Sequence, residues 1–199
     1  MGTTIRSGLL WGAIGIAPVS GLLGCNPSDV QAGDGGVNQG DGGVSGAKPE
    51  ADPKLQGITA LHNTARAGVN PQPATPLPPL TWDTKVAAAA QAVADSCSFQ
   101  HSGNGYGENI YAAAGSAPTP TDVVNSWTSE KANYTYSSNT CGANKTCGHY
   151  TQVVWRDSLR LGCGQKTCTT GSPFIGFPTW QFWVCDYDPP GNFGGQRPY

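Results

Sequence analysis

One carboxylate in this sequence stands where an apolar side chain would be expected. Val123, Trp127 and Glu130 follow one another at the i, i+4 and i+7 spacing of a single helix face. A carboxylate at the end of an apolar face is costly to bury unless a cation, a hydrogen-bond donor or a metal ion pairs with it. Glu130 is therefore the first residue that indicates a functional site.

The chain contains 7 cysteines, and the first of them has a sequence context of its own. Leu22-Leu23-Gly24-Cys25 resembles a bacterial lipobox, in which the cysteine thiol receives a diacylglycerol and the cysteine becomes the new N-terminus. We therefore expect Cys25 to be a lipid-attachment site, and an ordinary signal peptide cut nearby is the alternative. Setting Cys25 aside leaves six cysteines, an even number that can pair completely.

The residues before Cys25 have the composition of a targeting segment. Arg6 supplies a positive charge, and residues 9–23 are mostly apolar or small but are interrupted by glycines and a proline. A stretch this short and broken is not typical of a membrane-spanning helix, so residues 1–24 are expected to be a lipoprotein signal peptide. Asn26, not an aspartate, follows the cysteine. This favours an exported protein, placed on the bacterial outer membrane or cell surface, or in the extracellular space.

Residues 25–51 are rich in glycine and almost free of large apolar side chains. A partial Gly-Asp-Gly-Gly-Val repeat occupies residues 33–37 and 40–44. Such a segment cannot bury enough apolar surface to offset its backbone entropy, so we expect a disordered tether rich in glycine and aspartate. The predicted organisation is a signal peptide, a tether and one folded domain over residues 52–199.

The charge balance excludes one class of function. The chain has 199 residues, with 11 Lys and Arg against 13 Asp and Glu and a formal net charge of −2. Proteins that bind nucleic acid neutralise phosphates with a basic surface, and this sequence lacks the charge for one. We therefore expect no nucleic-acid partner.

The folded part combines helical and strand-like periods. The expected elements are helices from Asp52 to Gly68, from Asp83 to Ser96 and from Pro120 onward, and strands over Leu161–Gln165 and Trp180–Tyr187. The inner face of the second helix is expected to carry Val86, Ala89, Ala90, Val93 and Cys97. The hydrophobic period of residues 108–112 does not by itself distinguish a helix from a strand. Helices interleaved with a few strands predict an α+β or layered α/β/α domain.

Four sequence blocks then occur in a fixed order. They are Leu61-His62-Asn63-Thr64-Ala65-Arg66, then His101-Ser102 with Gly107-Glu108-Asn109-Ile110, then Gly148-His149-Tyr150-Thr151-Gln152-Val153-Val154-Trp155, and finally Phe182-Trp183-Val184-Cys185-Asp186-Tyr187-Asp188-Pro189-Pro190-Gly191-Asn192-Phe193. Together they resemble the CAP superfamily (cysteine-rich secretory protein, antigen 5 and pathogenesis-related protein 1), with the plant pathogenesis-related protein 1 branch nearest. The resemblance runs from about residue 54 to Tyr199.

The resemblance implies a fold. It implies an α+β, three-layer α-β-α sandwich with a small antiparallel sheet, in which Glu108–Ala112 is a strand and His149–Val154 a short helix. The family's disulfides imply the pairs Cys97–Cys168, Cys141–Cys147 and Cys163–Cys185, whereas six cysteines alone permit fifteen pairings. An apparent insertion over residues 169–179 is expected to lengthen a hairpin and leave the core unchanged. His62, with Asn63 and Arg66, is expected to connect the first helix to neighbouring loops.

The resemblance also implies a site. The residues that match the family's cleft are His101, Glu108, Glu130 and His149, and we expect them to bind a divalent metal ion, zinc being the natural candidate. The glutamates either complete the coordination or orient the imidazoles. Two protein histidines make an open, weak and exchangeable site. The alternative is a buried hydrogen-bonded network that fixes loop geometry.

The sequence indicates the function of the protein less closely than its fold. We expect a monomeric, non-enzymatic binding protein, held to the membrane by its lipid anchor. The resemblance implies a lipid, a sterol or an extracellular protein as its ligand. A hydrolase that uses His101 or His149 with a glutamate, either metal-assisted or activating a serine, is the runner-up, although neither Ser102 nor Ser126 lies in an activating motif. An inert surface adhesion module is a third possibility.

The C-terminal segment carries a separate hypothesis. Residues 189–199 resemble a peptide released from some plant members, but Cys185-Asp186-Tyr187 departs from the Cys-Asn-Tyr pattern that precedes the cut there. The favoured alternative is a C-terminal strap that packs on the domain.

Overall fold

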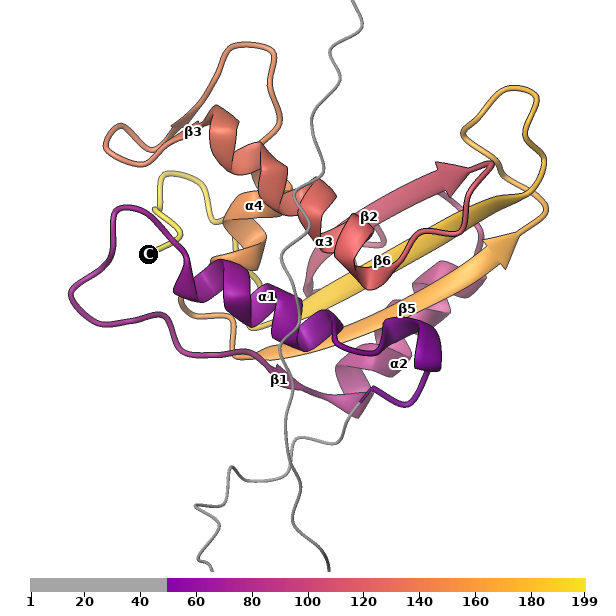
Figure 1. Cartoon of the computed structure of the whole chain (residues 1–199), viewed down its shortest axis with the longest axis horizontal. Helices are drawn as coiled ribbons and strands as arrows, with labels where there is room; N and C mark the ends of the chain where they lie inside the picture. Colours follow the sequence, from indigo (N-terminus) through magenta and orange to yellow (C-terminus); the bar gives the residue numbers. More distant parts are fainter. Residues whose placement is uncertain (1–49) are drawn as a thin grey trace, which may run out of the picture. The chain divides into compact units, whose positions relative to one another are not determined.

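The computed structural model describes residues 50–199 (Figure 1). The predicted signal peptide, the lipid-attachment residue Cys25 and all but the last two residues of the predicted tether lie outside the described residues. Within residues 50–199, none of the helices has the length and apolar character needed to cross a membrane.

The described part combines short helices with two sheets. The helices are the 3₁₀ turns η1 (Pro53–Leu55) and η2 (Glu130–Asn133) and the α-helices α1 (Ile58–Ala67), α2 (Thr84–Asp95), α3 (Pro120–Ser129) and α4 (Gly148–Val153). The strands are β1 (Thr81–Trp82), β2 (Gly107–Ala114), β3 (Tyr134–Thr135), β4 (Thr140–Cys141), β5 (Arg160–Cys168) and β6 (Trp180–Asp188). The residues that the resemblance assigned to a strand and to a short helix therefore lie in β2 and, for the most part, in α4.

The main sheet has four strands in the order β1-β5-β6-β2, and β3 pairs with β4 in a separate hairpin. Strands β5, β6 and β2 are antiparallel, but β1 runs parallel to β5, so the sheet is mixed and not purely antiparallel. Parallel neighbours require a long crossover, and the chain supplies one because α2 and the segments after it separate β1 from β5. Strand β2 lies at an edge of the sheet.

Helices cover both faces of this sheet, which confirms the three-layer α+β fold (Figure 1). One apolar cluster joins α2 to β6 through residues such as Ala90, Ala94 and Phe182. The other joins α1, α3 and α4 to the opposite face, with Trp127 and Tyr187 fully buried in it. Each layer of helices thus buries apolar side chains against the sheet.

Two predicted details of the helices were wrong. Asp52 caps the 3₁₀ turn η1 and not the first α-helix, which begins after Gly57 in a left-handed conformation, at φ +83°. The buried stripe of α2 is Val86, Ala90 and Ala94, whereas Ala89 and Val93 are only partly buried. That stripe is set by β5, where a Cβ on Gly162 would lie 2.0 Å from the Ala87 nitrogen. The helix backbone packs directly on this strand.

The first-helix motif fastens α1 to the loops beside it, as expected. Asn63 exchanges hydrogen bonds with the backbone of Leu80 at 2.7 and 3.0 Å. The buried Arg66 guanidinium donates to backbone carbonyls of five residues: Pro78, Val153, Trp155, Arg156 and Ser158. Burial lowers the pKa of Arg66 to about 10. These carbonyl contacts hold the end of α4 against α1, and α4 carries His149.

Three disulfides join the pairs that the resemblance implies. They are Cys97–Cys168, Cys141–Cys147 and Cys163–Cys185. The last joins residues directly opposite each other on β5 and β6. Residues 169–179 form the loop between β5 and β6, so the insertion lengthens a hairpin and the core is unchanged.

Candidate metal-binding site

Glu130 and His149 form the more buried of two histidine–glutamate pairs. Glu130 begins η2 directly after α3, and its Oε1 lies 2.7 Å from the Nδ1 of His149. Its Oε2 accepts hydrogen bonds from the backbone N–H groups of His149 (2.9 Å) and Tyr150 (3.2 Å) in the first turn of α4. The imidazole stacks on Trp127 with ring centroids 6.3 Å apart. The carboxylate at the end of the apolar helix face is therefore fully paired.

His101 and Glu108 form the second pair. The Nδ1 of His101 lies 2.8 Å from the Oε1 of Glu108, which comes from β2. Ser102 donates to the same carboxylate twice, from its backbone N–H (3.0 Å) and from its hydroxyl (2.6 Å). The Glu108 side chain is 5% exposed and the His101 side chain 63% exposed. A buried carboxylate thus fixes an imidazole that faces solvent.

The hydrogen bonds determine which imidazole nitrogen is free. An ionised carboxylate can only accept, so the Nδ1 of each histidine carries the proton that it donates to its glutamate. The Nε2 of each then keeps its lone pair, and within residues 50–199 neither Nε2 has a hydrogen-bond partner. Carboxylates hold metal-binding histidines in this orientation. Both glutamates are already engaged, which favours the orienting role over direct coordination.

Strand β2 connects the two pairs, because Glu108 belongs to one of them and its neighbour Asn109 contacts the other. Side chains alternate along a strand, and Glu108 shares a face with Ile110, which packs in the α2 cluster. Asn109 points the other way and donates to the backbone carbonyl of His149 (3.1 Å). Among residues 50–199 no three His, Cys, Asp or Glu side chains form a group that could hold a metal ion. Each histidine thus meets its own glutamate, and the four residues do not converge as one cluster.

Asp186 is a neighbour of this site that the sequence analysis did not include. It lies opposite Glu108 on β6 and is fully buried. Its Oδ2 accepts from Asn104 (2.8 Å), in the loop that carries His101, and within residues 50–199 its Oδ1 has no partner. Burial, together with the nearby charge of Glu108, raises the pKa of Asp186 to about 7. The departure from the Cys-Asn-Tyr pattern was the signal that marked this position.

A buried polar chain connects α1, β6 and β2 to His149. The Nδ1 of His62 lies 2.7 Å from the Ile58 carbonyl, and its Nε2 lies 2.8 Å from the Tyr187 hydroxyl. Asn109 donates to that hydroxyl (3.1 Å) as well as to the His149 carbonyl. Burial lowers the pKa of His62 to about 4. His62 is therefore a neutral structural residue, as the sequence analysis expected.

The C-terminal residues pack on the domain as a strap. The Arg156 N–H donates to the Pro198 carbonyl (2.7 Å), and Asn139 donates to the Gln196 carbonyl (3.0 Å). The Arg197 guanidinium donates to the carbonyl of Ser137 (2.7 Å). The carbonyl of Asp188, where the strap begins, accepts from the Leu159 N–H (3.0 Å). This packing is the alternative that the sequence analysis favoured over a segment poised for release.

A known protein family matches most of the described domain. Residues 59–187 match the model of the cysteine-rich secretory protein family, CAP. The chain belongs to the CAP family. Its domain is accordingly of a secreted type. The matched span contains both histidine–glutamate pairs and all three disulfides.

Curated relatives place this CAP domain beside plant proteins. It is 44% identical over 149 residues to a PR-1 type pathogenesis-related protein of Sambucus nigra, covering 72% of this chain and 81% of that protein. It is 42% identical over 154 residues to pathogenesis-related protein 1 of Arabidopsis thaliana, covering 75% of this chain and 85% of the relative.

Solved structures show the same fold. The crystal structure of NaASP2 with Zn²⁺ aligns with a TM-score of 0.59 and 25% identity, covering 73% of this chain and 84% of NaASP2. Venom allergen-like protein 4 of Schistosoma mansoni aligns with a TM-score of 0.53 and 27% identity. The alignment covers 71% of this chain and 90% of the Schistosoma mansoni protein. The CAP domain described above is thus similar in fold to both of these proteins.

Proposed function

We propose that this protein is an exported, lipid-anchored binding protein. Its CAP domain would hold a weakly bound, exchangeable divalent metal ion with His101 and His149, and would bind a lipid, a sterol or an extracellular protein. One observation carries the proposal: each imidazole is fixed through Nδ1 by a carboxylate, which leaves two Nε2 lone pairs unused.

The donor set fits a loosely held ion better than a structural one. Neutral imidazole nitrogens bind zinc and similar divalent ions well, but two of them leave most coordination positions to water. The glutamates already accept hydrogen bonds with both oxygens, so they would raise the basicity of the imidazoles and not coordinate directly. NaASP2, a structural relative at 25% identity, was crystallised with Zn²⁺, which supports the same ion here.

The hydrogen bonds speak against one form of the runner-up hydrolase, the form that activates a serine. In a serine–histidine–acid arrangement the imidazole lies between the hydroxyl and the carboxylate and takes the hydroxyl proton. Here Glu108 lies between Ser102 and His101, because both donate to its carboxylate. His101 is therefore not placed to activate Ser102, and binding is favoured over catalysis.

An apolar groove supports a lipid or sterol ligand. It lies between α1 and α3, has a volume of about 280 Å³, and is lined by apolar residues that include Leu61, Ala65 and Val124. Lys131 and Thr128 add polar groups to the same groove. A mostly apolar hollow with a few polar groups is typical of sites for small amphipathic ligands.

Zinc titration tests the metal site. We expect isothermal titration of the metal-free protein to show micromolar binding, on the order of that for two-histidine sites. The His101→Ala/His149→Ala double variant should stay folded and lose this binding. His62 remains in that variant, but both of its ring nitrogens are already hydrogen bonded. A folded wild-type protein that takes up no zinc would make the two pairs a purely structural network.

Palmitate and cholesterol titrations separate binding from catalysis. His149→Ala should leave lipid binding unchanged, whereas Ala65→Trp should fill the groove between α1 and α3 and abolish it. An enzyme would show the opposite pattern, with ester or peptide turnover lost in His149→Ala. The lipid anchor is tested by mass spectrometry of the membrane fraction, in which Cys25→Ala should remove the diacylglycerol.

A further inference from the structure

The loop between β5 and β6, residues 169–179, exposes apolar side chains without charged neighbours. Its sequence is Thr-Thr-Gly-Ser-Pro-Phe-Ile-Gly-Phe-Pro-Thr, with no Asp, Glu, Lys or Arg. Ile175 is fully exposed and Phe177 is 51% exposed. Single exposed apolar residues are ordinary, but two at the tip of an uncharged loop form a patch that water solvates poorly.

Contacts within the domain fix the conformation of this loop. The disulfide Cys97–Cys168 holds its first end, and the indole N–H of Trp180 at its second end donates to the Thr170 carbonyl (2.8 Å). The Phe177 N–H donates to the Phe174 carbonyl (3.3 Å), and Gly176 between them has φ +82°, as in a type II turn. Ile175 therefore stands at the tip of a built turn and does not need a partner to place it.

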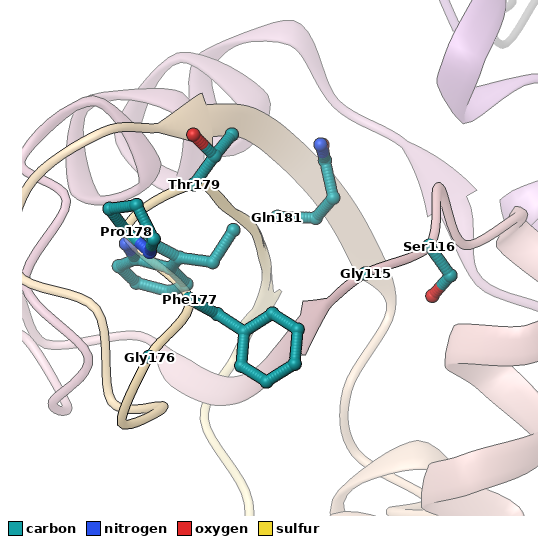
Figure 2. Close-up of a pocket in the computed structure, with 8 residues that line it drawn as sticks. Gly115, Ser116, Gly176, Phe177, Pro178, Thr179 and Gln181 are labelled. Atoms are coloured by element: carbon teal, nitrogen blue, oxygen red, sulfur yellow. The ribbon is translucent and has the colours of Figure 1, made fainter.

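Phe177 separates two uncharged hollows at the base of the turn. One, of about 410 Å³, is lined by Gly115, Ser116 and residues 176–181 (Figure 2). Figure 2 shows the Phe177 ring extending toward the Gly115 segment, and a Cβ on Gly115 would lie 3.6 Å from that ring. The other, of about 620 Å³, lies between residues 111–114 of β2 and the rest of the loop. Neither hollow is lined by a charged side chain.

A lipid bilayer is the partner that fits this surface. Apolar side chains flanked by uncharged threonine, serine and proline enter the interface without taking a charge out of water. The chain outside the described domain points to the same partner. Residues 26–49 limit the distance from Cys25 to Glu50 to about 85 Å, at roughly 3.4 Å per residue. A domain tethered at Cys25 therefore meets the bilayer at a high effective concentration.

We propose that the β5–β6 loop inserts Ile175 and Phe177 into the bilayer to which Cys25 anchors the chain, and so orients the CAP domain on the membrane. The proposal rests on the proposed lipid anchor for its membrane. With a net charge of −2 the chain has no electrostatic attraction to anionic lipid, so the contact is apolar and insensitive to salt.

Orientation has a consequence for the histidine–glutamate pairs. Ala114 of β2 pairs with Trp180 beside the loop, and Glu108 pairs with Asp186 further along the same ladder. At ~3.3 Å per residue, Glu108 lies ~20 Å from the loop end of the strand. Insertion of the loop therefore leaves His101 and Glu108 at the far end of the strand, facing the aqueous phase.

Hydrogen exchange on tethered protein tests the proposal. Cys25 is the only free thiol of the mature chain, Cys25–Tyr199, because the other cysteines form disulfides. It can be coupled to a maleimide lipid in phosphatidylcholine vesicles, or to soluble maleimide–polyethylene glycol as the reference. We expect the amides of residues 174–177 to exchange about tenfold more slowly on vesicles, at low and at high salt, with the β3–β4 hairpin unchanged.

Matched substitutions decide the outcome. Ile175→Ser/Phe177→Ser should abolish the slowing, and the variant should keep its fold because neither residue belongs to a core cluster. Leu159→Ser/Phe193→Ser removes two residues that are 44% and 51% exposed elsewhere on the domain, and should keep it. Equal exchange on vesicles and polymer would overturn the proposal. So would slowing confined to low salt and anionic vesicles, or a dimer in light scattering that the loop substitutions dissolve.

The chemical coupling keeps this test independent of the anchor. Because the maleimide lipid replaces the cell's own modification, the loop can fail while Cys25 is still found lipidated in the membrane fraction. Conversely, an unmodified Cys25 in cells, with a protected loop on vesicles, would count against the anchor alone.

Discussion

His62 and Asp186 are both fully buried, and burial shifts their pKa values in opposite directions. Burial favours the neutral form of histidine, so the pKa of His62 falls from 6.5 to about 4. Burial also favours the neutral form of a carboxylic acid, so the pKa of Asp186 rises from 3.8 to about 7. Protonation of His62 would also leave the Tyr187 hydroxyl facing two donors, since Asn109 already donates to it. The two residues thus have opposing effects over nearly the same pH range.

The free energy of unfolding should reveal this opposition. His62 makes the fold less stable as pH falls from 6.5 to 4, because the unfolded state binds its proton more readily. Asp186 makes it less stable as pH rises from about 4 to about 7, because the folded state keeps its proton. We expect urea unfolding of Asp186→Asn to show a stability that rises by about 3 kcal/mol between pH 4 and 6.5, relative to the wild type.

The control is Asp157→Asn, which neutralises an exposed carboxylate and should follow the wild-type pH profile. A His62→Gln variant should change the profile in the opposite sense to Asp186→Asn. Identical profiles for Asp186→Asn and Asp157→Asn would show that Asp186 is ionised in the folded protein.

Glu130 offers a second test at the level of single residues. Glu130→Gln removes the negative charge and keeps only one oxygen, so an N–H donor replaces the acceptor for either the Nδ1 proton of His149 or the first N–H groups of α4. A less polarised imidazole is a weaker ligand, so zinc affinity should fall about tenfold, and the lost acceptor should lower the free energy of unfolding by about 1–3 kcal/mol. Titration calorimetry beside Asp157→Asn measures this, and an unchanged dissociation constant would rule out a role for Glu130 in metal binding.

At the scale of elements, the contact between α2 and β5 sets the position of one face of the domain. Gly162 and Gly164 present backbone to the helix, and a Cβ at Gly164 would lie 2.4 Å from the Cα of Gln91. Because atoms do not approach this closely, any side chain at these positions must push the helix away. The two glycines therefore determine which side of α2 is buried.

Gly162→Ala should accordingly lower the free energy of unfolding by about 3 kcal/mol, the upper range for overpacking. Gly194→Ala adds the same methyl group where nothing lies within 4 Å, and its effect should stay within about 0.5 kcal/mol. Urea unfolding of both variants makes the comparison. Similar stabilities would mean that α2 can move outward without cost.

The same contact explains which parts of the fold could be predicted from sequence. The start of α2 at Asp83 and the start of α3 at Thr119 were predicted correctly, because capping is a local property of the chain. The buried stripe of α2 was misplaced, because it depends on glycines far along the chain. Likewise the four site residues were identified by resemblance, but which histidine meets which glutamate depends on tertiary contacts among β2, η2 and α4. Asp186 was not placed in the site for the same reason: only strand pairing brings it beside Glu108.

At the scale of the whole described domain, the disulfides differ in the length of chain that they close. Cys97 and Cys168 are separated by 71 positions, whereas Cys141 and Cys147 are separated by 6. A longer closed loop removes more conformational entropy from the unfolded state. The two crosslinks should therefore contribute unequally to stability.

We expect Cys97→Ala/Cys168→Ala to lower the free energy of unfolding by about 4 kcal/mol and Cys141→Ala/Cys147→Ala by about 2 kcal/mol. Urea unfolding of the two oxidised variants at one pH gives the comparison directly. A larger loss from the shorter loop would indicate that native contacts, and not unfolded-state entropy, dominate.

The Cys97–Cys168 disulfide also affects how readily the β5–β6 loop can change during evolution. Cys168 also forms the last pair of the β5–β6 ladder, with Trp180, so both ends of the loop between them are held independently of what the loop contains. Mutation and selection can then change the length and chemistry of residues 169–179 without disturbing the core. The position is one where a lineage can acquire a new recognition segment, and where an experimenter can graft a foreign peptide for display.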